Sequence, residues 1–271
     1  MGGERQVVMR KFLCLLTMAL AALFIGAQAQ AWALMVDGSV ADWGIDLSEA
    51  TSAGYLDTHK PSGGFSVTED NTDAAHGWFQ VGPGWSNGNY FDAEALYFTN
   101  DSTYAYFALV HGLPIEGVRA PGNPLYLPGD IAFDIDQDGS YDFGVDTSSF
   151  DSVNKQALLY STPTAGSWNP AQAFSVPGPW TVNTAQSTSL GAIDFVYSGL
   201  QNTHYVLEGR IRLDLLGLND GDKLFLFWTQ QCGNDYLKLD ATVMPEPATM
   251  MLLAQGLLAL GFAGLKKSKK S

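Results

Sequence analysis

The sequence predicts an all-β body, organised as a single antiparallel β-sandwich of jelly-roll type with long loops. No stretch between residues 35 and 244 sustains an apolar period of 3.6 residues over several helical turns. Short runs rich in β-branched and aromatic residues recur there instead, separated by Gly, Pro, Asn and Asp. Many short strands with turn signals between them are typical of a sandwich or jelly roll.

The strands can be assigned in order along the chain. Leu96–Thr99 and Tyr104–Val110 flank Asn100-Asp101-Ser102, a pattern that predicts a hairpin. Further strands are expected at Asp130–Ile135, Tyr141–Val145, Ala157–Ser161, Tyr205–Leu213, Leu224–Trp228 and Tyr236–Val243. Residues 57–93 and 162–191 are rich in Gly, Asn, Pro, Thr and Ser and are expected to be long loops.

Residues 1–33 have the organisation of a secretory signal peptide. A cationic segment with Arg5, Arg10 and Lys11 precedes the apolar run from Phe12 to Ile25. Small-residue cleavage patterns follow, and we expect cleavage after Ala33. The partners expected at this end are the Sec translocon and signal peptidase.

Residues 245–271 combine a stiff motif, an apolar segment and a basic end. Pro245-Glu246-Pro247 precedes the apolar run from Ala248 to Leu265, and four lysines follow within Lys266–Lys270. An apolar run of this length predicts a transmembrane helix, with the lysines on the cytoplasmic side. The sequence therefore predicts three regions: a signal peptide at 1–33, an extracellular β-sandwich at 34–244 and a C-terminal signal at 245–271.

This order of motif, apolar span and basic cluster resembles the PEP-CTERM sorting signal of exported bacterial proteins. The resemblance implies recognition by an exosortase, a membrane-embedded protease that acts near Pro245, Glu246 and Pro247. It also implies transient anchoring in the inner membrane, followed by a place on the cell surface or outside the cell. An ordinary single-pass anchor is the alternative.

The body between the two terminal regions is strongly acidic. Residues 34–247 hold 27 acidic and seven basic side chains, because half of the lysines and arginines lie in the terminal regions. Such a surface disfavours nucleic acid as a partner and favours divalent cations. Removal of residues 1–33 would leave Cys232 as the single cysteine, and we expect it to be buried.

The start of the body carries a second resemblance. Asp37-Gly38-Ser39-Val40-Ala41-Asp42-Trp43 looks like the opening of family 9 carbohydrate-binding domains and of related DOMON-like sandwiches. The resemblance implies a sandwich architecture and transfers no ligand contact to a residue of this chain.

A candidate calcium loop lies between two expected strands. Asp134, Asp136, Asp138 and Asp142 stand at positions 1, 3, 5 and 9 of the segment, and Gly139 stands at position 6. In a calcium loop the carboxylates bind the ion, glycine permits the sharp turn, and Ser140 would offer its backbone carbonyl. Position 12 is a valine, so the usual bidentate glutamate is missing. The alternative is a solvated acidic hairpin.

Four tryptophans of the expected loops could stack on sugar rings. They are Trp78, Trp85, Trp168 and Trp180, and exopolysaccharide is the ligand that such a platform would bind. Trp43 and Trp228 lie at expected strands and are predicted to be core residues. A carbohydrate-binding module is therefore the alternative function, and local packing of the loops is the structural alternative.

The chain offers little evidence of catalysis. Gly84-Trp85-Ser86-Asn87-Gly88 matches a serine-hydrolase pattern, but the strand and helix that this mechanism requires around Ser86 are not indicated. The four histidines are dispersed and are expected on loops or the surface; they are His59, His76, His111 and His204. The favoured interpretation is a non-enzymatic exported surface or matrix protein, stabilised by Ca²⁺.

Overall fold

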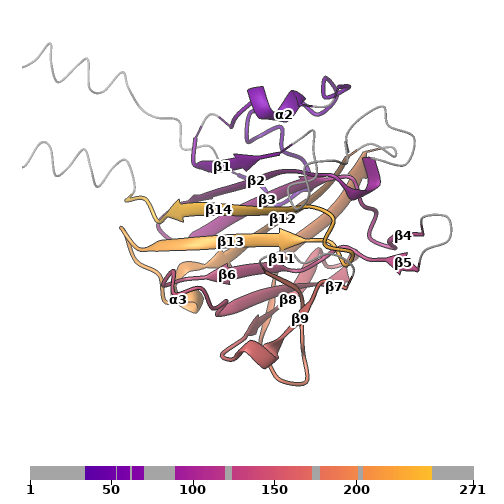
Figure 1. The fold of residues 1–271 in the computed structure, drawn as a ribbon. Coiled ribbons are helices and arrows are strands. Elements are labelled where there is room, and N and C mark those ends of the chain that lie inside the picture. Colours follow the sequence, from indigo (N-terminus) through magenta and orange to yellow (C-terminus); the bar gives the residue numbers. More distant parts are fainter. Residues whose placement is uncertain are drawn as a thin grey trace, which may run out of the picture. The chain divides into compact units, whose positions relative to one another are not determined.

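The computed structural model describes residues 34–52, 54–61, 63–69, 89–119, 124–172, 178–200 and 204–245. Its main feature is one antiparallel sheet of ten strands, in the order β1-β2-β3-β12-β11-β8-β7-β6-β13-β14 (Figure 1). The strands are β1 (Phe65–Thr68), β2 (Ala93–Asn100), β3 (Tyr104–His111), β6 (Ile131–Asp134), β7 (Phe143–Asp151), β8 (Gln156–Ser161), β11 (Thr188–Leu200), β12 (His204–Arg212), β13 (Lys223–Thr229) and β14 (Tyr236–Thr242).

Smaller elements decorate this sheet. Two short ribbons pair β4 with β5 and β9 with β10. Their bounds are Val118–Arg119 and Leu125–Tyr126, then Trp168–Pro170 and Pro179–Val182. The helices are single turns: α2 (Tyr55–Thr58), η1 (Asn89–Phe91), η2 (Ala165–Ser167) and α3 (Leu213–Leu216).

The sheet curls until it is nearly barrel-like. β14, at one edge of the strand order, also contacts β1 and β2 at the other edge. Alternate residues of the curled strands point inward and form the main core, which includes Phe107, Phe133, Phe195, Leu226 and Trp228. Along β14 buried residues alternate with exposed or partly exposed ones, as the period of two requires.

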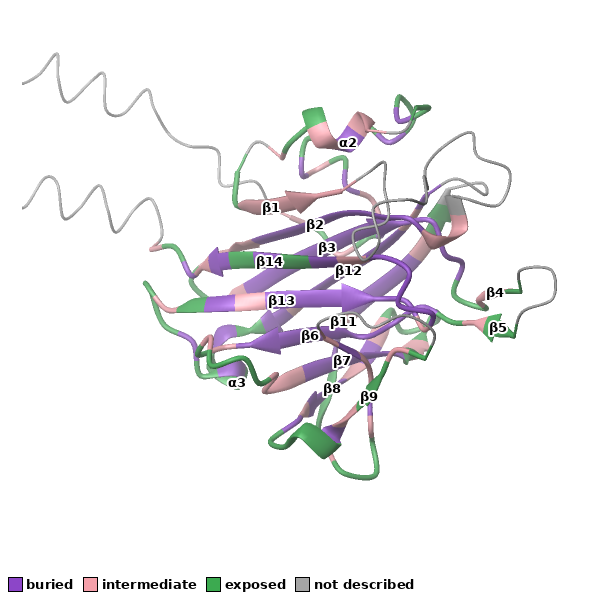
Figure 2. Cartoon of the chain, viewed as in Figure 1, coloured by how far each residue is buried: buried purple, intermediate pink, exposed green. Residues whose placement is uncertain are grey.

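A second core lies on the outer face of β2, β3 and β12. Residues 34–58, which we call the N-terminal strap, cross this face. The strap buries Val40, Trp43, Ile45 and Leu56 against outward residues of the three strands, such as Tyr97. Because both faces of β2 and β3 are covered, these strands are buried along most of their length (Figure 2). A fully covered strand reads as a continuous apolar run, as Tyr104–Val110 does.

Glu208 on β12 anchors the start of the strap. Its carboxylate accepts hydrogen bonds from the backbone N–H groups of Asp37 and Gly38, each at 2.9 Å. It also accepts one from Nε1 of Trp43 at 2.9 Å. The side chain is 2% exposed, so three protein donors replace the water that the carboxylate has lost. The Asp-Gly and Asp-Trp pairs that open the body therefore serve as contacts to one buried glutamate.

The all-β, antiparallel character of the body is confirmed. Each strand expected from residue 96 onward exists, with ends within three residues of those expected, except that β7 continues past Val145 to Asp151. The hairpin at Asn100-Asp101-Ser102 is present as β2 and β3, and the acidic turn joins β6 to β7. Trp43, Trp228 and Cys232 are 3%, 1% and 4% exposed, which confirms that they are buried.

Two expected long loops are only partly loops. The region 57–93 contains β1, and the region 162–191 contains β9, β10 and the first residues of β11. β11 was missed because its start, Thr188-Ser189-Leu190-Gly191, is exposed and carries the polar and glycine signals of a turn. Pairing of these residues with β8 overrides this local composition.

The two terminal regions expected to be targeting segments lie outside the described residues, except for Pro245. Among the residues that the structure does describe, none belongs to a helix long and apolar enough to span a membrane. The signal peptide, the transmembrane helix and the boundaries at 33 and 245 therefore stay predictions.

The Glu208 anchor makes stability depend on pH. Burial raises the pKa of Glu208 from 4.5 to about 7, despite the opposing hydrogen bonds from Trp43, Gly38 and Asp37. The folded state thus holds this proton more tightly than the unfolded chain, so the stabilisation is complete below pH 4.5 and is lost as the pH rises through about 7. Between pH 5 and pH 8 we expect Glu208 to account for a loss of about 2–3 kcal/mol.

The measurement is urea unfolding at both pH values in EGTA, for the wild type and Glu208→Gln. The glutamine variant should show the smaller loss of stability. Glu49→Gln removes an exposed carboxylate from the same strap and should follow the wild type. Equal pH dependence in the wild type and Glu208→Gln would contradict the assignment.

Candidate functional site

The loop between β6 and β7 is a local structure built from carboxylates and backbone N–H groups. Asp134 ends β6, and its Oδ2 accepts from the N–H of Gly139 at 3.0 Å. The N–H of Asp138 donates to Oδ1 of Asp136 at 3.2 Å, and that of Ser140 donates to Oδ1 of Asp138 at 2.7 Å. Gly139 has φ of 93°, a left-handed conformation that glycine adopts without strain. These bonds fold the segment back on itself.

Three of the predicted ligands come together in this loop. Asp134, Asp136 and Asp138 each offer one carboxylate oxygen, and the three oxygens lie within 4.8 Å of one another. Asp136 and Asp138 are exposed, whereas Asp134 is 1% exposed. Oδ1 of Asp134 has no hydrogen-bond partner among the described residues. A buried carboxylate oxygen without a donor is costly, and a cation is the group that would satisfy it.

The other two predicted ligands are placed differently. Asp142 lies outside the group of three, and its Oδ2 accepts from the N–H of Ile135 at 2.9 Å. Burial raises the pKa of Asp142, and the charges of Asp136, Asp134 and Asp138 raise it further. Ser140 contributes its N–H to the fold of the loop. Asp142 therefore stabilises the fold of the loop through its hydrogen bond with Ile135, outside the group of three carboxylates.

The acidic loop is also tied to the last strand. Nε2 of Gln137 donates to Oδ1 of Asp240 on β14 at 2.9 Å. Asp134 and Asp240 both stand opposite Phe225 of β13, so the three residues form a row across β6, β13 and β14. Sequence reasoning missed Gln137 and Asp240, because only the strand pairing brings residue 240 next to the loop. Gln137 has φ of 60°, which marks it as a residue held in an unusual conformation.

An aromatic row lies beside this loop. The ring of Tyr141 is 5.7 Å from that of Phe227, which stacks on Tyr236 at 5.7 Å. Trp168 meets Tyr141 edge to face at 6.1 Å. Burial raises the pKa of Tyr141, and the charge of Asp134 adds to this shift. We call Tyr141, Trp168, Phe227 and Tyr236 the aromatic row.

The structure describes two of the four predicted sugar-stacking tryptophans. Trp168 and Trp180 lie on β9 and β10, and both are half-buried. Each indole donates to a backbone carbonyl at 3.2 Å, that of Tyr141 for Trp168 and that of Pro128 for Trp180. Both side chains thus hold the β9–β10 ribbon against the sheet. Trp78 and Trp85 lie outside the described residues, as does Ser86.

The prediction that the histidines lie on loops or the surface is wrong for two of them. His111 ends β3 and is 0% exposed; His204 begins β12 and is 3% exposed. A histidine at the end of a strand resembles a loop residue in sequence, and only the tertiary fold covers it. His59 is exposed as expected, and His76 lies outside the described residues.

His204 forms a buried pair with Glu94. Its Nδ1 lies 2.7 Å from Oε2 of Glu94, and its Nε2 lies 2.8 Å from the backbone oxygen of Ala50. Because a carbonyl only accepts, Nε2 carries a proton. Burial raises the pKa of Glu94. The pair is neutral overall whichever partner holds the second proton, and it ties the strap to the sheet.

His111 occupies an aromatic environment. Its ring centroid is 4.7 Å from that of Trp228 and 5.6 Å from that of Tyr197. Nδ1 accepts from the N–H of Leu113 at 3.1 Å, so the neutral ring carries its proton on Nε2. Burial lowers the pKa of His111 to about 3. A neutral imidazole of this kind fits a packing role.

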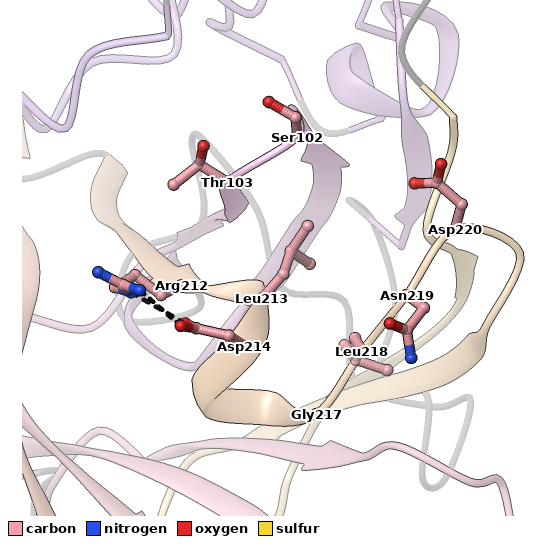
Figure 3. Close-up of a pocket in the computed structure, with 9 residues that line it drawn as sticks. All are labelled: Ser102, Thr103, Arg212, Leu213, Asp214, Gly217, Leu218, Asn219 and Asp220. Atoms are coloured by element: carbon pink, nitrogen blue, oxygen red, sulfur yellow. Dashed lines mark hydrogen bonds and ion pairs between the residues drawn. The ribbon is translucent and has the colours of Figure 1, made fainter. Parts of the chain in front are cut away.

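A groove of about 750 Å³ opens at the end of the sheet where β12 meets α3 (Figure 3). Arg212 and Asp214 form an exposed ion pair on its wall, with Nε and Oδ1 2.9 Å apart. The remaining lining residues are Ser102, Thr103, Leu213, Gly217, Leu218, Asn219 and Asp220. None of the predicted site residues lines it, and its lining contains no histidine or cysteine.

Comparison with known proteins adds no assignment. No protein-family model matches the chain. No curated protein gives a significant match. The candidate calcium site therefore rests on the geometry of the β6–β7 loop. The expected targeting regions at the two ends of the chain rest on their sequence patterns.

Proposed function

We propose that the protein is a non-enzymatic, exported surface or matrix protein whose β body is stabilised by Ca²⁺ at the β6–β7 loop. The observation that carries the calcium site is the buried Oδ1 of Asp134, which has no partner among the described residues and lies beside Asp136 and Asp138. Hard cations such as Ca²⁺ take oxygen ligands from several carboxylates and carbonyls. The acidic body, whose charge attracts cations, supports the same proposal.

The loop also has the shape that a cation site requires. The backbone N–H groups of the loop orient Asp134, Asp136 and Asp138 through one oxygen each, which leaves the second oxygen of each carboxylate for an ion. Asp142, just before β7, accepts from Ile135, and Gln137 of the loop donates to Asp240 of β14, so the loop is held on two sides. A cation would neutralise three carboxylates that otherwise repel one another across a short distance.

The finer description of the fold belongs to this proposal. We propose that the curled sheet works as a jelly-roll-like β-sandwich, with β14, β13 and β6 forming one wall. Contacts of β14 with β1 and β2, and the main core enclosed by the curled sheet, support this description.

We further propose that Pro245-Glu246-Pro247 directs an exosortase to the C-terminal region. The support comes from the sequence, since the motif, the apolar run and the basic cluster occur in the order of a PEP-CTERM signal. Pro245 is half-buried and follows the last buried core residue, Val243, by two positions. The motif thus begins at the last described residue, two positions after the core residue Val243.

A carbohydrate-binding module is the second candidate function. The aromatic row supports it, because the half-buried rings of Tyr141, Trp168 and Tyr236 lie on the outer face beside the acidic loop. Aromatic faces of this kind stack on sugars, and the acidic surface would favour a neutral glycan.

The calcium proposal predicts that the effect of Asp134→Asn on stability changes sign between EGTA and Ca²⁺. In EGTA, Asp134→Asn should be at least as stable as the wild type, because it removes one charge from three clustered carboxylates. In Ca²⁺ at 100 times its dissociation constant, the wild type should gain about 2.7 kcal/mol, and Asp134→Asn should lose most of this gain. Thermal unfolding with Ca²⁺ and with EGTA measures both effects. Asp220→Asn, an exposed change, should respond as the wild type does; an unchanged wild-type melting temperature would remove the site.

The sorting proposal predicts a processed C-terminus. The exported wild type should lack the residues after Pro247, because an exosortase cuts near this motif. Intact-mass measurement of the exported protein tests this, and replacement of Glu246 by alanine should yield unprocessed chains. A wild-type mass that extends through Ser271 would instead show a plain anchor.

The second candidate predicts glycan retention. If the aromatic row binds sugars, the wild type should be slowed in gels that contain neutral polysaccharides, and Tyr236→Ala should migrate freely. Tyr55→Ala removes a ring from α2, away from the row, and should behave as the wild type. Free migration of the wild type with all polysaccharides would exclude this function.

A further inference from the structure

Hydrogen bonds and core packing fix the chain beyond the end of β14. That strand ends at Thr242, but the N–H of Val243 donates to the backbone oxygen of Asp222 at 2.9 Å. The backbone oxygen of Val243 accepts from the N–H of Gly221 at 2.8 Å. Val243 itself is 0% exposed and belongs to the main core. The chain is therefore fixed up to this residue.

The next residue is held by a side chain. Oδ1 of Asn100 accepts from the N–H of Met244 at 2.7 Å, and Nδ2 of Asn100 donates to the backbone oxygen of Met244 at 2.8 Å. We call this pair of bonds the Asn100 clamp. The amide side chain pairs with Met244 as a neighbouring strand would, through one donor and one acceptor. The Met244 side chain is 52% exposed, so the clamp rather than packing fixes this residue.

The clamp joins opposite edges of the strand order. Asn100 ends β2, the second strand of the sheet, whereas Met244 follows β14, the last. The two residues are separated by 144 positions in the chain. Both bonds therefore require that the sheet has curled and that β14 has reached β2. The clamp at Met244 therefore forms only after the sheet has closed.

Met244 is also the last residue before the Pro-Glu-Pro motif. Proline has no N–H to donate, and it restricts the residue before it to an extended conformation. The clamp and Pro245 hence favour the same backbone conformation at Met244. The motif starts one residue after a fixed point of the folded body.

We propose that Asn100 is a positioning residue for C-terminal processing. The inference rests on the proposed sorting function. By fixing Met244, Asn100 holds the start of the motif at Pro245 at a constant place relative to the folded body. Processing is thereby coupled to closure of the sheet, since a body whose β2 and β14 are apart cannot form the clamp.

The test compares the wild type with Asn100→Ala and Asn100→Asp in the full-length, exported chain. Asn100→Asp keeps the acceptor for the Met244 N–H but sets a carboxylate oxygen against the Met244 carbonyl. Hydrogen exchange of the Met244 amide should become about tenfold faster in Asn100→Ala, the size expected for a lost pair of exposed hydrogen bonds. The rate at which the processed form accumulates should fall severalfold in both variants, while the melting temperature stays close to that of the wild type.

Asn154→Ala is the matched control, because it removes an exposed amide from the turn between β7 and β8. It should leave processing unchanged. A wild type that is processed at the same rate as Asn100→Ala, although Met244 exchanges faster in the variant, would overturn the positioning role alone. A wild type that is never processed would overturn the sorting function itself, and the positioning role with it.

Discussion

A carboxylate that is taken out of water must find donors, and this strongly acidic chain buries carboxylates at the joints between its elements. Glu208 accepts hydrogen bonds from two backbone N–H groups and an indole at the start of the strap. Asp130 accepts from the N–H of Val182 in the β9–β10 ribbon and from Thr147 on β7. Asp235, directly before β14, accepts from the N–H of Ala93, which links the start of β14 to β2. Each buried acid thus joins parts of the chain that are distant in sequence, and burial raises the pKa of both Glu208 and Asp130 to about 7.

Asp134 departs from this rule in a way that suggests its role. One of its oxygens is satisfied by Gly139, while the other is buried without a partner among the described residues. At Asp130, by comparison, donors reach both oxygens, since Thr147 bonds Oδ1 and the N–H of Val182 bonds Oδ2. Asp136 and Asp138 each place a carboxylate oxygen within 4.8 Å of one of Asp134, and carboxylates cannot donate when ionised. A bound cation would compensate this burial, which is why the calcium proposal centres on Asp134.

Local patterns of the sequence were enough to predict the hairpins and the acidic loop. Tyr104–Val110 reads as a strand because its residues are β-prone and apolar, and the Asp residues of the loop act over a few positions. The burial of Trp43 could be predicted, but its partner could not, since Glu208 lies 165 positions later on β12. The same holds for His204, whose partner Glu94 lies 110 positions earlier. Closure of the sheet, the Gln137–Asp240 contact and the Asn100 clamp are contacts between distant positions, which the periodicity of a single segment cannot reveal.

The place where the chain leaves the body follows from the sheet order. β14 pairs with β13 alone within the described sheet, so it is an edge strand, and exposed edges invite unwanted pairing with other chains. The curl reduces this exposure by bringing β14 against β1 and β2, and Lys238 and Asp240 place charge on its outer face. The C-terminal end of β14 must also be fixed, because fraying that begins at Thr242 would expose the backbone N–H groups of this strand. The bonds of Val243 with Gly221 and Asp222, and of Met244 with Asn100, supply that end. The same contacts that protect the edge therefore also determine where the Pro-Glu-Pro segment emerges.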